Sequence, residues 1–307
     1  MSTAGKIVLK FLRVFPYVRN LEKNVGFFEK SCGFPPGHYY SPIVDSDEYY
    51  KQQQLPFSSA EYIPVEIDFN ESAQFELLKA FDSYYDEMPF TDHAKDGLRY
   101  YFDNDFFTNA DAITLYLMLR HFKPKRIIEI GSGFSSALIL DTNAVFLEGS
   151  TDLTFIDPNP ERLINLLHPN EKVNLLKQKI QDVDLKVFSK LEAGDFLLID
   201  TSHVSKSGSD VNYIYFNILP MLNVGVKIHI HDVFFPFEYP EKWVVEERRG
   251  WNELYLLRAF LAYNKEFQMI FFNEYLANKY PSLIKEKMPR FVKPASTVTG
   301  GIWIERV

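Results

Sequence analysis

From about residue 105 onward, short apolar runs alternate with segments whose apolar residues recur every three or four positions. The short runs predict buried strands, and the helical period predicts amphipathic helices. The predicted strands are 126–130, 153–157, 173–177, 195–200, 225–231, 267–272 and 301–305. The predicted helices are 112–122, 135–147, 160–167, 184–191, 211–222 and 253–263. This alternation predicts βαβ units around a mostly parallel sheet that is covered on both faces.

The first hundred residues have a different character. They contain short patterned pieces separated by turn-forming residues, and the densest turn signal covers 33–42. One stretch, about 72–88, has apolar residues at helical spacing. We therefore predict two parts, an α-rich N-terminal extension or lid over 1–100 and a larger domain over 101–307.

Charge and cysteine content exclude several classes of protein. The chain carries 33 basic and 41 acidic residues, a net charge of -8, which argues against partners such as nucleic acid or an anionic membrane surface. The single cysteine, Cys32, allows no internal disulfide and fits a cytoplasmic location. Lys6, Lys10 and Arg13 interrupt the N-terminal apolar residues, so we expect no signal peptide. The longest uncharged run, 211–226, is too short and too polar to span a bilayer.

A glycine-containing loop follows the first predicted strand of the larger domain. The segment 129–136 reads Glu-Ile-Gly-Ser-Gly-Phe-Ser-Ser, and Gly131 and Gly133 allow a ligand to approach the bare backbone. The next strand ends in Asp157, 24 residues after Gly133, where a carboxylate accepts hydrogen bonds from ribose hydroxyls. Together these features indicate a cofactor that contains adenosine.

Two residues of the loop argue against a dinucleotide. The third small position is Ser136, where a dinucleotide loop prefers glycine or alanine. Glu129 precedes Gly131 by two residues, and its carboxylate would repel a pyrophosphate but suit a ligand with a positively charged amino-acid end. The alternative for Glu129 is a salt bridge to a neighbouring helix. An NAD-type oxidoreductase is therefore the less favoured interpretation.

The Glu-x-Gly-x-Gly segment and the strand-end acid resemble the class I S-adenosylmethionine-dependent methyltransferases. The resemblance covers about 105–307 and implies a Rossmann-like, doubly wound α/β sheet of seven strands with the last strand antiparallel. It also implies that S-adenosylmethionine is the cofactor, with Asp157 on the ribose and Asp182 beside the adenine. The alternative for Asp182 is a helix N-cap. The full set of implied cofactor residues is Glu129, Gly131, Ser132, Gly133, Ser135, Asp157 and Asp182.

Acidic and imidazole side chains follow two further strands. Asp200 ends one strand, with His203 three residues later, and His231 and Asp232 end the next. Because the carboxyl ends of parallel strands meet at one edge of a sheet, we expect these four side chains to converge. Carboxylates suit Mg²⁺, an imidazole ligand is more typical of Mn²⁺ or Fe²⁺, and a free imidazole can take a proton from a hydroxyl. The alternative is that each residue caps a loop or bonds the backbone.

This second pattern resembles the metal-dependent sugar and natural-product O-methyltransferases. The resemblance implies that Asp200, His231 and Asp232 hold Mg²⁺ or Mn²⁺ and that His203 is the catalytic base. The sequence departs from the family at His231, where relatives carry an acid. A metal-free site with His203 or His231 as base therefore stays open.

The sequence as a whole predicts an O-methyltransferase for a small-molecule or glycan hydroxyl. The alternatives are a metal-free methyltransferase, an NAD-type oxidoreductase and a non-catalytic adenosyl-binding protein. The aromatic segments 234–243 and 249–253 predict either a lid over the acceptor or a loop packed under the helix 253–263. The N-terminal aromatic segment suits either a homo-oligomer interface or a cover for the sheet.

Overall fold

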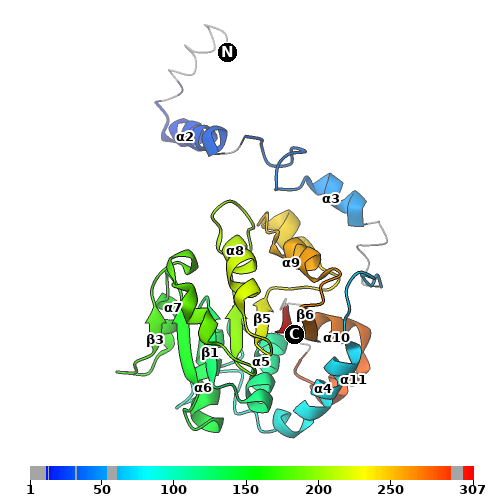
Figure 1. The fold of residues 1–307 in the computed structure, drawn as a ribbon. Helices are drawn as coiled ribbons and strands as arrows, with labels where there is room; N and C mark the ends of the chain where they lie inside the picture. Colours follow the sequence, from blue (N-terminus) through cyan, green and yellow to red (C-terminus); the bar gives the residue numbers. More distant parts are fainter. Residues whose placement is uncertain (1–11, 13, 32, 54–60, 292–299) are drawn as a thin grey trace. The chain divides into compact units, whose positions relative to one another are not determined.

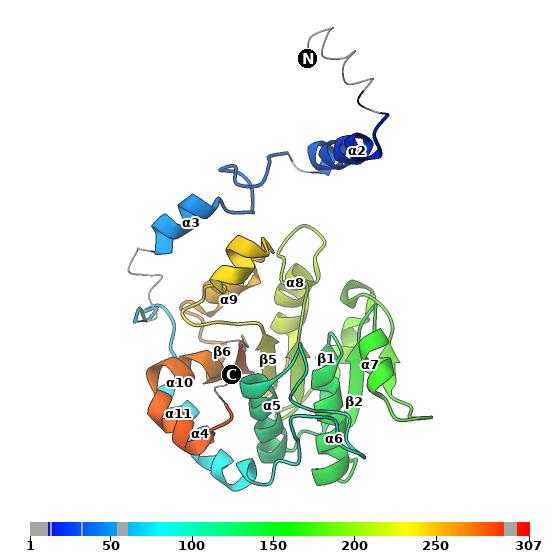
Figure 2. The ribbon, with the colours of Figure 1, turned by 180° about the vertical axis from the view of Figure 1, so that it is seen from behind.

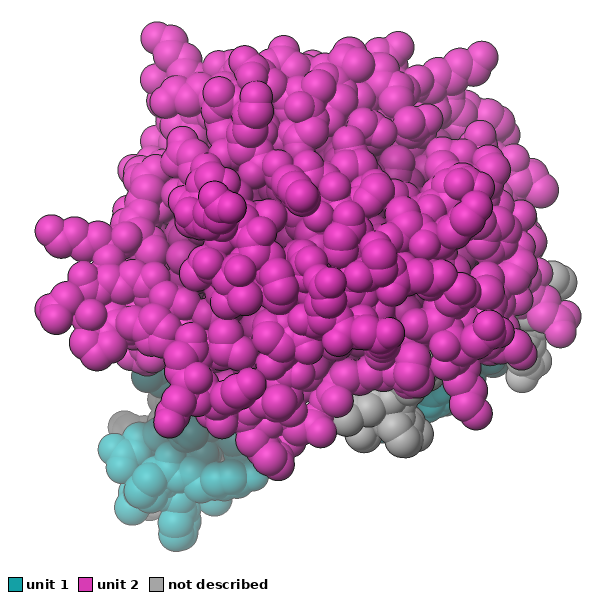
Figure 3. Space-filling model, turned by 90° about the horizontal axis from the view of Figure 1, so that it is seen from below, with its two compact units in different colours: residues 1–54, 241–250 teal, residues 55–240, 251–307 magenta. Residues whose placement is uncertain are grey.

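The computed structural model describes residues 12, 14–31, 33–53, 61–291 and 300–307. These residues divide into two compact units, one within 1–54 and 241–250 and the other within 55–240 and 251–307 (Figure 3). The predicted domain boundary near residue 100 stays a prediction. Cys32 lies outside the described residues.

The smaller unit contains α2 (Pro16–Ser31), α3 (Ser46–Gln53) and one π-helical turn, Lys242–Glu246. The turn-rich stretch 33–42 is irregular here too, and it is held by the Gly37 N–H, which donates to the Ile43 carbonyl at 3.0 Å. Within this unit the Tyr50 hydroxyl donates to the Glu241 carboxylate at 3.0 Å, so segments far apart in the sequence are joined.

The larger unit is built on one sheet of seven strands in the order β3-β2-β1-β4-β5-β7-β6 (Figure 1). β7 pairs antiparallel with both β5 and β6, and the pairs β1–β2, β2–β3, β1–β4 and β4–β5 are parallel. This confirms the predicted seven-stranded Rossmann-like sheet with an antiparallel last strand. The strands are β1 (Arg126–Ile130), β2 (Asp152–Ile156), β3 (Asn174–Leu176), β4 (Phe196–Ile199), β5 (Lys227–His231), β6 (Phe267–Phe272) and β7 (Gly301–Arg306).

Helices connect the strands, and Figure 2 shows them from the side opposite to Figure 1. α5 packs against α6 and against α4, and α6 packs against α7. The helices are α4 (Glu71–Tyr85), α5 (Asn109–Phe122), α6 (Phe134–Phe146), α7 (Glu161–Leu166), α8 (Asp210–Tyr213), α9 (Glu253–Leu261), α10 (Asn273–Lys279) and α11 (Pro281–Lys287). Short 3-10 helices cover Ile180–Asp182, Leu185–Lys190 and Leu219–Met221, and a π-helix, Ile214–Ile218, continues α8.

The core explains why the strands could be read from the sequence. All four residues of β4 and all five of β5 are buried, as expected for central strands covered on both faces. Most of α5 is buried as well, which fits its position between α4 and α6. Among the described residues, no helix combines the length and the apolar character that crossing a bilayer requires.

Two local predictions need correction. The segment predicted as a helix over 184–191 is a 3-10 helix, and Asp184 caps it by accepting from the Lys186 N–H at 2.9 Å. The alternative that Asp182 caps this helix is therefore wrong. The four aromatic residues after β5, Phe234, Phe235, Phe237 and Tyr239, are 2–5% exposed and belong to the core.

Candidate active site

The loop after β1 turns sharply against the end of β4. Gly131 has φ +80°, and a β-carbon at this position would lie 2.5 Å from the carbonyl oxygen of Asp200. Only glycine meets both demands without strain, because left-handed backbone and a closely packed carbonyl each exclude a side chain. The glycine is therefore required by the crossing of two chain segments, in addition to any approach of a ligand.

Asp157 holds this loop in place from the end of β2. Its Oδ2 accepts hydrogen bonds from both the backbone N–H and the hydroxyl of Ser132, each at 2.9 Å. Its Oδ1 accepts from the Asn159 N–H at 2.7 Å. Asp157 therefore orders the loop itself, and its predicted contact with a ribose stays a prediction.

Glu129 lies beneath the loop and is 2% exposed. Its Oε2 accepts a short hydrogen bond from the Ser136 hydroxyl, which in turn accepts from the Gly133 N–H at 3.0 Å. Burial raises the pKa of Glu129 to about 8, although its hydrogen bonds with Ser135 and Ser136 act in the opposite direction. The carboxyl group therefore supports Gly133 through Ser136, and it holds a proton near neutral pH.

A cavity of about 450 Å³ opens beside this loop. Of the predicted cofactor and metal residues, Gly131, Ser132, Asp157 and Asp200 line it. Glu129, Gly133, Ser135 and Asp182 are not among its lining residues, whereas Ile180 and Gln181 are. Asp182 as an adenine contact stays a prediction, and Gln181 is the neighbouring side chain that lines the cavity.

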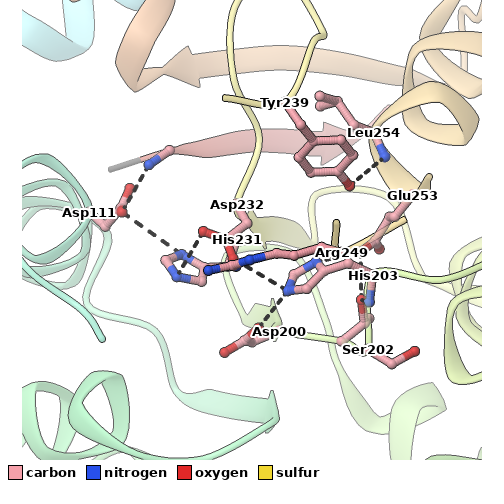
Figure 4. A network of polar contacts seen from close by, with 12 residues as sticks. Asp111, Asp200, Ser202, His203, His231, Asp232, Tyr239, Arg249, Glu253 and Leu254 are labelled. Atoms are coloured by element: carbon pink, nitrogen blue, oxygen red, sulfur yellow. Dashed lines mark hydrogen bonds and ion pairs between the residues drawn. The ribbon is translucent and has the colours of Figure 1, made fainter. Parts of the chain in front are cut away.

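His203 lies between two carboxylates at the edge of the sheet (Figure 4). Its Nε2 is 3.3 Å from Asp200 Oδ1 and 3.4 Å from Asp232 Oδ2, and its Nδ1 is 3.0 Å from Glu253 Oε2. Burial would lower the pKa of His203, but its hydrogen bonds to Asp200 and Glu253 outweigh burial and raise the pKa to about 10. The structure thus brings together three of the four side chains predicted to converge, around the imidazole.

Glu253 is a member of this cluster that sequence reasoning missed. It is the first residue of α9, is 2% exposed, and its Oε2 also accepts from the Thr201 hydroxyl at 2.5 Å. The ring of Trp251 covers the imidazole of His203, with ring centroids 4.2 Å apart. Glu253 follows neither a strand end nor a glycine loop, so the sequence gives no sign of its role. Its contact with His203 is seen only in the structure.

The backbone also fixes the imidazole. His203 and Asp232 adopt left-handed conformations, with φ of 57° and 56°, which are uncommon for residues with a side chain. The His203 carbonyl accepts from the N–H groups of Asn252 and Glu253 at 3.0 and 3.2 Å. Such conformations persist where the surrounding structure enforces them, and they cluster at functional sites.

His231 lies next to this cluster, and its two ring nitrogens point toward different carboxylates (Figure 4). Its Nε2 is 3.6 Å from Asp232 Oδ1, and its Nδ1 is 3.9 Å from Asp111 Oδ2. Burial would lower the pKa of His231, but the surrounding carboxylates, Asp232 first, raise it. Within the described residues, the side chains whose ligand atoms lie within 4.8 Å of one another are Asp111, His229 and His231. The predicted metal set of Asp200, His231 and Asp232 stays a prediction.

Comparisons with known proteins agree with this fold. A family model described as a methyltransferase domain matches residues 128–233, from β1 to just past β5. An uncharacterized protein of Archaeoglobus fulgidus is 34% identical over 165 residues, which is 52% of this chain and 74% of that protein.

Several solved structures of methyltransferases are similar at low identity. The plantazolicin methyltransferase BpumL with S-adenosylhomocysteine (SAH) is 17% identical, covers 64% of this chain and 82% of its own, and has a TM-score of 0.40. The SAH-bound methyltransferase PaMTH1 of Podospora anserina is 14% identical, with coverages of 85% and 94% and a TM-score of 0.41. The O-methyltransferase TomG of Streptomyces achromogenes, bound to S-adenosylmethionine, is 14% identical, with coverages of 85% and 96% and a TM-score of 0.38.

The assignment rests on the domain match, the relative that is 34% identical and the order of the strands. The glycine loop after β1 and the acid after β2 lie within the matched residues. This chain belongs to the class I S-adenosylmethionine-dependent methyltransferases.

Proposed function

We propose that the chain is an O-methyltransferase that acts on a hydroxyl group of a small molecule or a sugar. The observation that carries the proposal is the position of Asp200, which lines the cavity beside Gly131 and also bonds His203. The imidazole of His203, which can take a proton, is therefore linked to the cofactor loop through Asp200. A hydroxyl needs such a group, because it is a weak nucleophile while it keeps its proton.

The residues of the cavity fit the cofactor. The volume of about 450 Å³ suits a small-molecule site, and Asp157 stands at its wall where a ribose would bind. S-adenosylmethionine, when bound, supplies a methyl group on a positively charged sulfur. Because its pKa of about 10 keeps His203 protonated near neutral pH, only its neutral form can serve as the base. In that form Nε2 would accept the hydroxyl proton, the acceptor oxygen would form the new bond to the methyl carbon, and the carbon–sulfur electron pair would stay with sulfur.

Glu253 would act as a positioning residue for this step. Its contact with Nδ1 of His203, at 3.0 Å, directs Nε2 toward Asp200 and the cavity. A carboxylate behind an imidazole fixes the ring orientation and stabilises the imidazolium that forms when the proton is taken. Trp251 packs against the same ring, with the two rings tilted by 37°.

The donor set also suits a divalent cation. The carboxylates of Asp200 and Asp232 lie near each other, since one oxygen of each is within 3.4 Å of Nε2 of His203. Asp200, Asp232 and His231 would hold the ion, and Mg²⁺ or Mn²⁺ would supply a Lewis acid that lowers the pKa of the acceptor hydroxyl. A metal-free site is the second candidate, because the imidazole of His203 already bridges the two carboxylates.

The test is a screen of hydroxylated acceptors with S-adenosylmethionine that carries a labelled methyl group. On the first acceptor found, His203→Ala is expected to lose about 10²–10⁴-fold in rate, the usual contribution of a general base, while SAH binding is retained. Glu253→Gln is expected to lose less and to change the pH profile, and Glu253→Asp to recover part of the rate. Glu274→Gln, which changes a half-buried carboxyl that accepts from the Phe235 N–H, serves as the control.

Addition of EDTA distinguishes the two candidates. If Asp200 and Asp232 hold a metal, EDTA stops turnover, Mg²⁺ or Mn²⁺ restores it, and Asp200→Asn cannot be restored. If EDTA has no effect while His203→Ala is inactive, the site is metal-free. Normal turnover by His203→Ala and Asp200→Asn together would place the chemistry elsewhere.

A further inference from the structure

A second polar cluster lies on the side of His231 that faces α5. Asp111 from the first turn of α5 and the two histidines of β5, His229 and His231, each offer one ligand atom, and these atoms lie within 4.8 Å of one another. The three residues are 1%, 2% and 9% exposed. The cluster shares only His231 with the candidate active site, and Figure 4 shows Asp111 and Asp200 on opposite sides of that ring.

Two imidazole nitrogens of this cluster have no hydrogen-bond partner. His229 Nε2 and His231 Nδ1 are both buried and unpaired, and the distance of 3.9 Å from His231 Nδ1 to Asp111 Oδ2 is too long for a hydrogen bond. Buried polar atoms are normally satisfied, so two unpaired imidazole nitrogens beside one carboxylate call for a bound group.

The backbone of β7 leaves room for such a group. A β-carbon on Gly301 would lie 2.7 Å from His229 Nε2 and 2.9 Å from Asp111 Oδ1. Because residue 301 is glycine, that space between the imidazole and the carboxylate holds no side chain. Any other residue at this position would enter the cluster.

A set of outer hydrogen bonds holds the carboxylate of Asp111. The Asn273 side-chain amide donates to its Oδ1 at 2.7 Å, and the Gly300 N–H donates to its Oδ2 at 3.2 Å. The Thr114 hydroxyl donates to the Asn273 amide oxygen at 2.8 Å, which fixes the orientation of that amide. Ligands of metal centres are commonly oriented by partners of this kind.

We infer that Asp111, His229 and His231 bind a divalent transition metal, with zinc as the first candidate. Two imidazoles and one carboxylate are a donor set typical of Zn²⁺ and Fe²⁺, whereas Mg²⁺ prefers oxygen ligands. Coordination at about 2.0–2.2 Å requires the three side chains to close around the ion. The ion joins the start of α5 to the end of β5 and fixes His231 beside Asp232. This site is independent of which acceptor the enzyme methylates.

The test measures Zn²⁺ binding to the full chain after metals have been removed by chelation. Wild-type protein is expected to bind one Zn²⁺ tightly at this site and to melt at a higher temperature with it, and Co²⁺ is expected to give the visible bands of a low-coordinate nitrogen-containing site. Asp111→Asn and His229→Gln should weaken binding by at least about 100-fold, and Asn273→Ala by about 10–100-fold, as for outer partners of other metal centres.

Two variants make the result specific. Asp200→Asn alters the other carboxylate cluster and should bind Zn²⁺ at this site as wild type does. Gly301→Ala keeps every ligand but fills the space between them, so it should lose binding, and it carries the test if Asp111→Asn fails to fold. Absence of stoichiometric Zn²⁺ binding by the wild type would overturn the inference. Loss of this binding in Asp200→Asn, alone or together with Asp111→Asn, would overturn it as well, because the ion would then belong to the active-site carboxylates.

Discussion

At the scale of single residues, the same carboxyl groups serve the fold and the chemistry. Asp157 fixes Ser132 through two hydrogen bonds before any ribose is bound, and Glu129 supports Gly133 through Ser136. Removing either group therefore changes the loop as well as the ligand contact.

Asp157→Ala should weaken the binding of S-adenosylhomocysteine by about 1–3 kcal/mol, the cost of leaving hydrogen bonds of a charged group unmade. Isothermal titration calorimetry measures the affinity of the variant and of the wild type for S-adenosylhomocysteine. Glu161→Ala, which removes an exposed carboxylate that pairs with Lys177 nearby, should leave the affinity unchanged. Equal affinity for the Asp157 variant and the wild type would show that the ribose does not bind there.

Glu129 predicts an unusual dependence of stability on pH. Its pKa is about 8 in the folded protein, against an ordinary value of 4.5, so the folded chain keeps a proton that the unfolded chain loses. The free energy of unfolding should therefore fall as pH rises from about 4.5 to 8. At 1.36 kcal/mol per pKa unit, the contribution from this group is at most about 5 kcal/mol.

The measurement is urea denaturation of wild type and Glu129→Gln across this pH range. Glutamine cannot lose a proton, so the stability of the wild type relative to the variant should decrease steadily toward pH 8. Asp111 and Glu274 also have raised pKa values, and the comparison cancels their effects because both proteins contain them. If the difference in unfolding free energy between the two proteins does not change with pH, the pKa of Glu129 is not raised in the folded protein.

At the scale of elements, the loop between β1 and α6 depends on one glycine. Gly131→Ala should destabilise the fold by more than the 1–2 kcal/mol that a left-handed alanine costs, because the new β-carbon also meets the Asp200 carbonyl at 2.5 Å. Gly149→Ala is the control, since Gly149 has φ +66° with nothing within 4 Å of its β-carbon position. Denaturant melts should rank Gly131→Ala well below Gly149→Ala. If the two variants lose equal stability, the loop must shift to accommodate the added β-carbon.

The elements of the larger unit could be predicted because their sequence signals are local. β1 and β6 have the predicted bounds, and the other predicted strands differ by a few residues at their ends. The short helices α10 and α11 carry no long amphipathic period, and they were missed. The aromatic residues 234–239 allowed either a lid or core packing, and only the tertiary structure decides between these.

The site could be predicted only where it follows strand ends. Asp157, Asp200 and Asp232 each come directly after a strand, so topology alone places them at one edge of the sheet. Asp111 and Glu253 lie in the first turns of helices far away in the sequence, and no pattern connects them to His203 or His231. Contacts of this kind depend on how helices pack against the sheet, which no local signal encodes.

At the scale of the whole molecule, β7 joins two parts of the sheet that are otherwise separate. It pairs with β5 on one side and β6 on the other, and Ile302, Trp303 and Ile304 are fully buried. Deleting residues 301–307 should abolish cooperative folding. The three side chains alone contribute about 1.5–3 kcal/mol each, against a net stability of about 5–15 kcal/mol for a typical domain.

Circular dichroism and urea melts check this expectation, with deletion of Val307 alone as the control. Val307 is exposed, although its N–H donates to the Glu266 carbonyl, so its loss should cost little. A sharp unfolding transition in the variant that lacks residues 301–307 would show that the sheet folds cooperatively without β7.

The position of Trp303 in β7 gives the protein a built-in optical reporter. Its indole is fully buried, with its ring centroid 5.0 Å from that of His229 and 5.1 Å from that of Phe196. Fluorescence from this indole should be emitted at shorter wavelengths while β7 is paired and shift to longer wavelengths when water reaches it. With Trp243 and Trp251 replaced by phenylalanine, the remaining emission would report closure of the sheet, and quenching by Co²⁺ would report ion binding at His229.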